Sequence, residues 1–156
     1  MALVCDTGAV FGLYDADDAH HETIKAVVEK EPGPLFLPVV LLAEIDYLLS
    51  TRLGQDAALE FLESVEQGAY LLVPMTSADL RRCRELIRQY RDLQLGIADA
   101  AVVAAAERLG LQRLFTLDER HFRAIKPRGF NHFVLLPADA DSIKPRRTRG
   151  RNRRGR

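Results

Sequence analysis

The chain has few cysteines and none of the short motifs that mark the commonest cofactor and nucleophile sites. Its two cysteines, Cys5 and Cys83, are far apart and form no C-x-x-C pair, so we expect neither a cysteine zinc site nor a disulfide framework. The sequence also contains no G-x-G-x-x-G, no Walker lysine motif and no G-x-S-x-G. Dinucleotide binding, P-loop chemistry and serine-hydrolase chemistry are therefore not indicated.

Long apolar runs are absent as well. No stretch approaches the roughly 20 apolar residues that a membrane-spanning helix needs. The first ten residues lack the basic segment of a secretory signal, and their apolar run is interrupted at Asp6. We therefore expect a cytoplasmic protein.

Basic and acidic residues balance only over the whole chain, in which 22 Lys and Arg face 22 Asp and Glu. Eight of the basic residues lie in 144–156, which leaves 14 against 22 acidic residues in 1–143, a net charge of −8. Such a body binds phosphates poorly unless it holds a metal ion or uses the basic tail. We expect a domain over residues 1–138 and a basic, disordered tail over 139–156.

The chain is long enough for one domain with a real core, since 47% of its 156 residues are hydrophobic and 28% are charged. Short runs rich in branched apolar residues alternate with longer segments of helical period, which predicts an α/β domain with a parallel sheet. The predicted strands are 2–5, 35–37, 69–73, 113–116 and 132–136. The predicted helices are about 20–31, 39–52, 55–67, 77–91 and 98–109.

Two acids follow predicted strands directly. Asp6 ends the first strand in LVCDTG and opens the next helix, and Asp118 follows a strand in FTLDERHF and precedes a short helical turn. In open α/β sheets, ligands bind beyond the carboxyl ends of the strands. The alternative for both residues is a helix N-cap, a role that Asp fills well.

A third acid lies among apolar neighbours within a predicted helix. Glu44 has Val40, Leu41, Tyr47 and Leu48 at helical spacing, and an isolated carboxylate on a buried face of this kind would cost several kcal/mol. A cation offsets that cost, whereas a Glu at the edge of the apolar stripe avoids it. Asp46 has similar neighbours but lies about 200° away around the helix, so both acids cannot face one site, and their spacing leaves open which one does.

The fourth acid, Asp99, opens the segment IADAAVVAAAERLG. The body of this segment is so apolar and its side chains are so small that we expect a buried, closely packed helix. The alternative role for Asp99 is a favourable interaction with the helix dipole. Capping alone does not require three acids at strand-to-helix junctions together with one acid inside a helix.

The order DTGAV, LLAEIDYLL, GIADAAVVAAAERLG and FTLDERHF, over about residues 3–137, resembles the PIN domain, specifically the VapC-type ribonuclease toxins. The resemblance implies a five-stranded parallel sheet flanked by helices. It also implies one pocket that binds Mg²⁺ or Mn²⁺ and consists of Asp6, Glu44, Asp99 and Asp118, which favours Glu44 over Asp46. Thr7 stands at the usual polar position after the first acid, and Thr116 stands where a supporting hydroxyl is often found.

The resemblance further implies partners: an RNA substrate, a cognate antitoxin protein, and a second copy of the chain in a homodimer. Apolar residues of the helices 39–52 and 55–67 are candidates for the dimer contact. In such a site the acids act as metal ligands, and water attacks the RNA phosphodiester. Because four gathered carboxylates repel one another and offer only hard oxygen ligands, we expect Mg²⁺ or Mn²⁺ rather than zinc.

Other residues are given non-catalytic roles. We expect the four histidines, His20, His21, His121 and His132, at the surface or at the rim.

A haloacid dehalogenase-type phosphatase also has an Asp at the first strand end, but it needs a second Asp two residues later, where this chain has Gly8. A non-catalytic RNA-binding or protein-interaction module, in which the acids only cap helices, is the alternative function.

Overall fold

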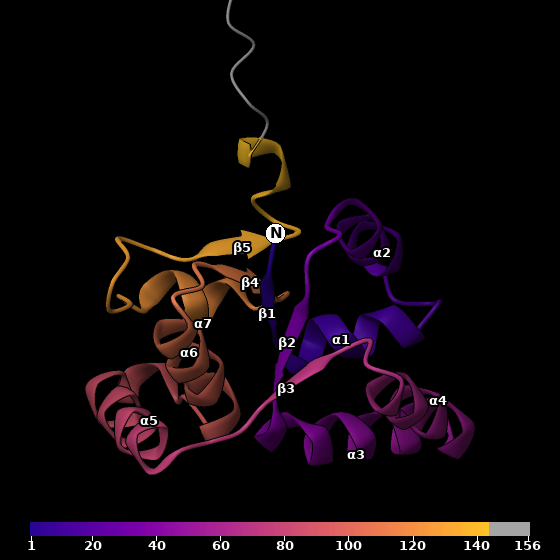
Figure 1. The fold of residues 1–156 in the computed structure, drawn as a ribbon, viewed down its shortest axis with the longest axis horizontal. Coiled ribbons are helices and arrows are strands. Elements are labelled where there is room, and N and C mark those ends of the chain that lie inside the picture. The colour runs from indigo at the N-terminus through magenta and orange to yellow at the C-terminus, as the bar shows by residue number, and fades with distance from the viewer. Residues whose placement is uncertain (144–156) are drawn as a thin grey trace, which may run out of the picture.

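The computed structural model describes residues 1–143 and contains a parallel sheet between two layers of helices (Figure 1). The five strands are β1 (Leu3–Cys5), β2 (Leu35–Pro38), β3 (Leu71–Val73), β4 (Arg113–Phe115) and β5 (Val134–Leu136). They lie in the order β3-β2-β1-β4-β5, and every neighbouring pair is parallel. The prediction of an α/β fold with about five parallel strands is confirmed.

Helices cover both faces of the sheet. The α-helices are α1 (Thr7–Tyr14), α2 (His21–Lys30), α3 (Leu42–Arg52), α4 (Gln55–Glu66), α5 (Ser77–Gln89), α6 (Ile97–Leu109) and α7 (Glu119–Ala124). Short 3₁₀ helices occur at η1 (Val39–Leu41), η2 (Arg91–Leu93) and η3 (Ala140–Ile143). Helices α1 to α4 lie on one side of the sheet and α5 to α7 on the other (Figure 1). This arrangement buries both faces, as an all-parallel sheet requires.

Two strands begin two residues later than predicted: β5 at Val134 rather than at residue 132, and β3 at Leu71 rather than at residue 69. Gly68 has a φ of +85°, a conformation that favours glycine. The amide of Ala69 donates to the carbonyl of Ser64 at 2.9 Å, so this residue completes the end of α4 instead of pairing with β2.

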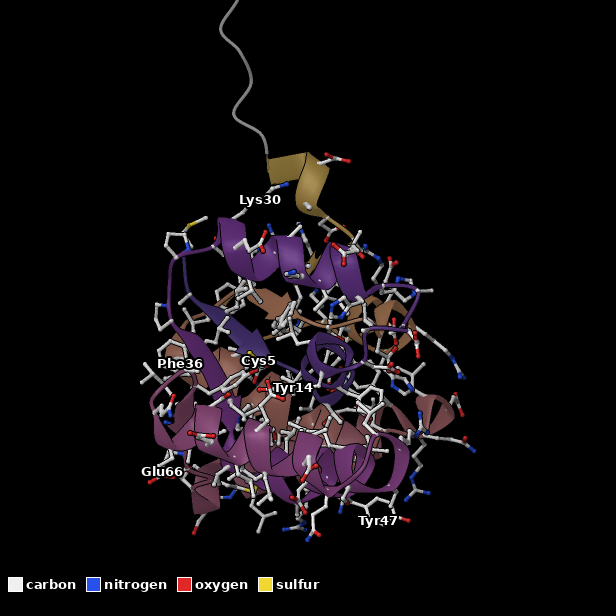
Figure 2. All side chains as sticks on the ribbon, turned by 90° about the vertical axis from the view of Figure 1, so that its right-hand side faces the viewer. Cys5, Tyr14, Lys30, Phe36, Tyr47 and Glu66 are labelled. Carbon is white, nitrogen blue, oxygen red and sulfur yellow. The ribbon has the colours of Figure 1, made fainter. Side chains whose placement is uncertain are left out.

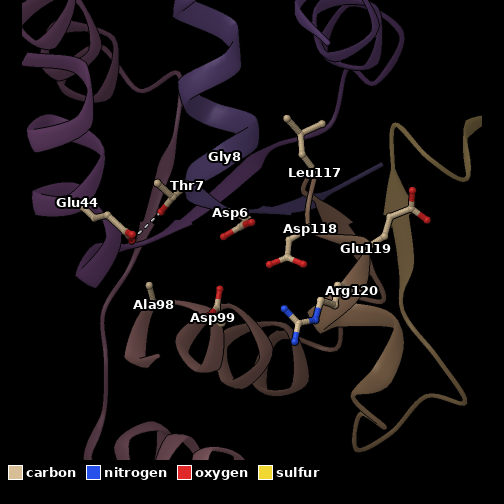
Figure 3. A pocket seen from close by; sticks show the side chains of 10 residues that line it. All are labelled: Asp6, Thr7, Gly8, Glu44, Ala98, Asp99, Leu117, Asp118, Glu119 and Arg120. Carbon is tan, nitrogen blue, oxygen red and sulfur yellow. Dashed lines mark hydrogen bonds between the residues drawn. The ribbon is translucent and has the colours of Figure 1, made fainter. Parts of the chain in front are cut away.

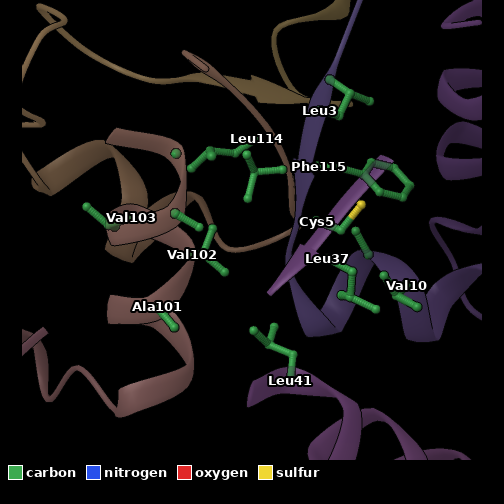
Figure 4. Close-up of a cluster of buried hydrophobic side chains, with 14 of the residues drawn as sticks. Leu3, Cys5, Val10, Leu37, Leu41, Ala101, Val102, Val103, Leu114 and Phe115 are labelled. Carbon is green, nitrogen blue, oxygen red and sulfur yellow. The ribbon is translucent and has the colours of Figure 1, made fainter. Parts of the chain in front are cut away.

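Helix α6 is the tightly packed helix that its sequence predicts. All residues from Ala100 to Ala106 are buried, because alanine and valine side chains are short enough to let the helix approach the sheet closely. Figure 4 shows Leu114 of β4 directed toward this helix and the adjacent Phe115 directed to the opposite face. Successive side chains of a strand point to opposite faces of the sheet, so Leu114 lies on the face of the sheet that α6 covers.

On the other face, aromatic side chains join α1 to α4. The ring of Phe61 packs edge-on against Tyr14 and against Tyr70, with 5.9 Å between ring centroids in both pairs. Figure 2 shows Tyr14 between these helices, and it shows Tyr47 at the outer surface of α3, where 65% of this residue is exposed. Phe61 itself is fully buried, so it anchors α4 on this side of the sheet.

The described structure continues past residue 138, the predicted end of the domain. Asp139 accepts a hydrogen bond from the backbone amide of Leu135 at 2.8 Å and pairs with Arg123 at 2.7 Å, and η3 follows it. The predicted basic segment from Lys144 lies outside the described residues. Within residues 1–143, no helix is long and apolar enough to cross a membrane.

Candidate active site

Strand order places the site at the centre of the sheet. Strand β1 lies between β2 and β4, and Cys5 at the end of β1 is in register with Phe115 at the end of β4. The chain passes from β1 toward β2 on one side and returns in β4 on the other, which opens a crevice at the carboxyl ends of these strands. The residues that follow β1, β2 and β4 therefore meet there.

Asp6 is the innermost acid of this crevice, with 7% of the residue exposed. Its Oδ2 accepts a hydrogen bond from Thr116 Oγ1 at 2.7 Å, and its backbone amide donates to the carbonyl of Phe115 at 2.9 Å. Although Asp6 occupies the N-cap position of α1, its side chain caps no amide. The N-cap interpretation is therefore wrong for Asp6, and its carboxylate is directed into the crevice instead.

Burial is the largest cause of a raised pKa at Asp6, which reaches about 6 from an ordinary value of 3.8. The charges of Asp99 and Asp118 raise this pKa further, whereas the hydrogen bond from Thr116 lowers it. Asp99 and Asp118 are thus close enough to disfavour the ionisation of Asp6. A bound cation would relieve this repulsion.

Asp99 and Asp118 reach the crevice from the starts of α6 and α7, and each also caps its helix. Asp118 accepts from the backbone amide of His121 at 3.0 Å, and Asp99 accepts from that of Gly96 at 3.3 Å. The hydroxyl of Thr116 also accepts from the backbone amide of Asp118 at 3.0 Å. Capping and a position in the pocket are therefore compatible for these two acids.

Glu44 lies on the first turn of α3 and completes the lining on the side of β2. Its Oε2 accepts a hydrogen bond from Thr7 Oγ1 at 3.0 Å, and it lines the pocket whereas Asp46 does not. Of the two alternatives for Glu44, the structure supports the position at the edge of the apolar stripe. Glu44 is exposed, and so is its neighbour Tyr47, because this turn of the helix faces the opening of the pocket.

The structure brings all four predicted acids to one pocket of about 620 Å³ (Figure 3). The residues that line it are Asp6, Thr7, Gly8, Glu44, Ala98, Asp99, Leu117, Asp118, Glu119 and Arg120. Within the part of the chain that the structure describes, Arg120 forms no ion pair. Its guanidinium lies beside the acids in Figure 3, where it is available to a phosphate.

His121 was predicted at the surface or the rim, with no role beside the acids, but it lies against two of them. Only 18% of its side chain is exposed, and its Nδ1 lies 2.7 Å from Asp118 Oδ2 and 3.7 Å from Asp99 Oδ2. A sequence signal existed, because residues three apart at the start of a helix share a face. By contrast, His20 and His132 are exposed, and His21 contacts the carbonyl of Gly12 at 2.8 Å, away from the acids.

The donor set fits a divalent cation. One ligand atom from each of Asp99, Asp118 and His121 can lie within 4.8 Å of the others, and the buried carboxylate of Asp6 is coupled electrostatically to the two acids of this set. Carboxylate oxygens are the preferred ligands of Mg²⁺ and Mn²⁺. Glu44 stands apart, on the side of the pocket where Thr7 holds it (Figure 3).

Comparison with known families agrees with this architecture, because the model of the PIN domain matches residues 3–126. The chain belongs to the PIN-domain family. A PIN-domain relative, "Ribonuclease VapC26" of Mycobacterium tuberculosis (strain ATCC 25618 / H37Rv), is 33% identical over 135 residues, which make up 86% of this chain and the whole of the relative. The predicted family resemblance is confirmed.

Solved structures share the PIN fold. VapC20 of Mycobacterium tuberculosis, described as a sarcin-ricin loop cleaving toxin, superposes with a TM-score of 0.72 at 22% identity, over 78% of this chain and 94% of the other. VapBC2 from Rickettsia felis, solved with a DNA fragment from its promoter, gives a TM-score of 0.62 at 14% identity, over 86% and 97% of the two chains. At identities of 22% and 14%, the structural similarity shows that these proteins share the fold of this chain.

Proposed function

We propose that this protein is a metal-dependent endoribonuclease and the toxin of a toxin–antitoxin pair. The observation that carries the proposal is the convergence of Asp6, Asp99 and Asp118, with Glu44 beside them, at the switch point of a PIN-domain chain related to a VapC ribonuclease. Four acids from four separate segments serve no common structural purpose in the sheet. What they share is that their carboxylate oxygens line one pocket.

Each acid has a position that suits a ligand of Mg²⁺ or Mn²⁺. Thr116 holds one oxygen of Asp6, Thr7 holds one oxygen of Glu44, and the helix starts hold Asp99 and Asp118. When bound, a divalent ion supplies a water of lowered pKa and neutralises charge on the leaving oxygen. No serine, cysteine or lysine lines the pocket, and the hydroxyl of Thr7 donates to Glu44; we assign to the acids the role of orienting water toward the phosphodiester.

The rim supports RNA as the substrate. Arg120 lines the pocket without an ion-pair partner among residues 1–143, so its guanidinium can bind a phosphate oxygen while the acids lie below. The pocket is open enough to admit a chain from the side, since Glu44 at one edge and Arg120 at the other are both exposed. A pocket that is open in this way can admit a continuous RNA strand, which is then cut at an internal phosphodiester.

A cognate antitoxin is the proposed protein partner. One of the solved structures that share this fold is a toxin–antitoxin complex from Klebsiella pneumoniae, with a TM-score of 0.61 at 16% identity. An acidic pocket attracts a guanidinium or ammonium when no metal is bound. We expect an extended antitoxin segment to place a basic side chain among the four acids and thereby to block RNA.

A homodimer is proposed on the apolar surface of α3 and α4. Tyr47, Leu59 and Leu62 are 65%, 57% and 41% exposed, and α3 packs against α4, so these side chains belong to adjoining helices. Light scattering after size exclusion tests the dimer. A monomer for wild type at every concentration would contradict it, whereas a dimer that Leu59→Asp converts to a monomer, and the exposed α5 variant Leu80→Asp does not, would support it.

The proposed activity is tested by mapping RNA ends in cells after induction of the protein. Wild type should generate new RNA ends at defined positions and arrest growth. Asp99→Asn should abolish both, because it removes one charged ligand from the pocket without changing the size of the side chain. Asp92→Asn, on exposed η2, is the matched control and should behave as wild type.

Two results would contradict the proposal. The same new ends with Asp99→Asn would show that cleavage does not depend on the carboxylate cluster. The absence of new ends with abundant, folded wild-type protein would favour the non-catalytic module, in which the acids act only as caps.

A further inference from the structure

His121 has a contact on each side of its imidazole ring. On one side, Nε2 lies 2.8 Å from the carbonyl oxygen of Leu93 in η2. On the other side, Nδ1 lies 2.7 Å from Asp118 Oδ2 and 3.7 Å from Asp99 Oδ2. The ring therefore bridges the backbone of η2 and the acid pocket.

The contact with Leu93 determines which ring nitrogen carries hydrogen. A carbonyl oxygen only accepts hydrogen bonds, so Nε2 is the donor. In the neutral imidazole the lone pair then lies on Nδ1, the ring nitrogen that approaches the two carboxylates. A backbone carbonyl that fixes the tautomer and the ring orientation in this way is the usual support of a metal-binding histidine.

The Nδ1 atom has no satisfactory partner within the described residues. It is buried and forms no hydrogen bond, although Asp118 Oδ2 lies 2.7 Å away, because a neutral Nδ1 without hydrogen and a carboxylate oxygen are both acceptors. A buried polar atom without a hydrogen bond costs free energy. A cation between Nδ1 and the two acids would give this atom a partner and would also relieve the repulsion between the carboxylates.

The distances suit a single ion. Ligand atoms on adjacent positions of an octahedral ion at ~2.1 Å are about 3 Å apart, and the two separations of 2.7 and 3.7 Å lie on either side of this value. Glu44 contributes nothing to this group, since Thr7 holds it at the other side of the pocket. The group therefore has two oxygen donors and one nitrogen donor.

We propose that His121 Nδ1 is a direct ligand of the metal ion that Asp99 and Asp118 hold, and that it makes this position selective for Mn²⁺ over Mg²⁺. The inference rests on the proposed metal-dependent function and adds a nitrogen ligand to Asp99 and Asp118. Mg²⁺ prefers an all-oxygen shell and retains its water. Mn²⁺ also prefers oxygen ligands, but as a transition-metal ion it binds imidazole more strongly than Mg²⁺ does, so the nitrogen gives Mn²⁺ the larger gain of the two.

The test uses the full-length protein loaded with Mn²⁺ and no RNA. Electron spin echo envelope modulation of bound Mn²⁺ should show coupling to a directly coordinated nitrogen in wild type. His121→Asn should lose this coupling, whereas His132→Asn, whose histidine is exposed outside the pocket, should retain it. By titration calorimetry, His121→Asn should weaken Mn²⁺ binding at least about tenfold and should weaken Mg²⁺ binding much less.

The outcomes separate this inference from the proposed function. If Mn²⁺ binds, requires Asp99, and shows no nitrogen coupling in wild type, the assignment of His121 is wrong and the acid site stands. If wild type binds neither ion, both proposals fail. The wild-type spectrum decides the assignment even if His121→Asn folds poorly, and the near-ultraviolet circular dichroism of that variant shows whether its calorimetry can be compared.

Discussion

Asp6 is the pocket carboxylate that burial affects most. Only 7% of the residue is exposed, whereas the side chains of Asp99 and Asp118 are 24% and 33% exposed. Its position follows directly from the register of β1 and β4, which sets Thr116 beside it. The residue therefore combines the strongest desolvation with the most rigid support, as expected for a ligand that must remain oriented before the metal arrives.

Burial of Asp6 should destabilise the metal-free protein near neutral pH. Its folded pKa of about 6 lies above the ordinary value of 3.8, so the folded state holds this proton more tightly than the unfolded state does. The associated stability is fully present below about pH 4 and is lost as the pH rises through 6. In EDTA at pH 8, Asp6→Asn should therefore be more stable than wild type, by up to about 3 kcal/mol.

Thermal and urea unfolding of the two proteins between pH 4 and pH 8 checks this prediction. The stability difference should grow from pH 4 to pH 6 and then remain constant. Asp17→Asn, an exposed substitution in the turn after α1, is the control and should show no such dependence. A constant difference between Asp6→Asn and wild type across the range would contradict the buried, charged state of Asp6.

At the scale of the elements, one ion pair connects the two halves of the sheet. Glu31, which follows α2, accepts from the guanidinium of Arg113 in β4 through both of its oxygens, one of them at 2.8 Å, and from the amino group of Met1 at 3.2 Å. Arg113 is 8% exposed. These segments are far apart in sequence, so the pair fixes α2 over the amino end of the sheet, opposite the acid pocket.

Glu31→Gln should cost about 3 kcal/mol of stability at pH 7, because it leaves the buried Arg113 charge without a counter-ion. The hydrogen bonds from Arg113 are the main cause of the pKa of Glu31 falling to about 2 from 4.5. Stability from this pair is therefore present above pH 4.5 and is lost as the pH falls toward 2. Urea unfolding should show the difference between wild type and Glu31→Gln narrowing over that interval.

The control for this pair is Glu29→Gln, an exposed substitution in the last turn of α2, which should change stability by less than about 0.5 kcal/mol. RNA cleavage by folded Glu31→Gln should equal that of wild type, since Glu31 lies away from the pocket. A pH-independent difference, or no difference at all, would show that the pair contributes little.

Particular residues show what the sequence could and could not predict. The meeting of Asp6 and Asp118 could be predicted from the strands that precede them, because the carboxyl ends of all strands in a parallel sheet lie at one edge. Glu44 and Asp46 could not be separated by helical spacing, because the direction of α3 depends on η1 and on packing against α1 and α4. His121 was missed because its orientation depends on the carbonyl of Leu93, which is 28 residues away in the chain.

At the scale of the whole molecule, charge is divided between an acidic body and a basic end. Residues 1–143 carry a net charge of −8, and the eight basic residues of 144–156 balance it. An acidic body repels RNA at long range, so we predict that the basic segment contributes RNA affinity rather than chemistry. The segment contains no aromatic residue, so it should bind without strong base preference.

Salt dependence tests this prediction with the metal-free Asp6→Asn protein, which binds RNA without cutting it. If the segment neutralises about four phosphates of single-stranded RNA, the slope of log K against log salt should be steeper by roughly 3 for the full chain than for a protein ending at Ser142. Equal slopes would exclude the segment from RNA binding. A difference in slope, together with unchanged cleavage sites when the active protein is truncated at Ser142, would agree with a role in affinity alone.

The central claim is that four carboxylates from separate segments form one metal-dependent site for RNA cleavage. Single-turnover cleavage of a labelled RNA by purified protein, in Mn²⁺ and in EDTA, measures it most directly. Wild type should cut only with metal, and Asp6→Asn, Glu44→Gln, Asp99→Asn and Asp118→Asn should each be slower by at least about 100-fold. Asp46→Asn, on the same helix as Glu44 but outside the pocket, should retain full activity. Undiminished cleavage in EDTA, or in the four pocket variants, would contradict the account.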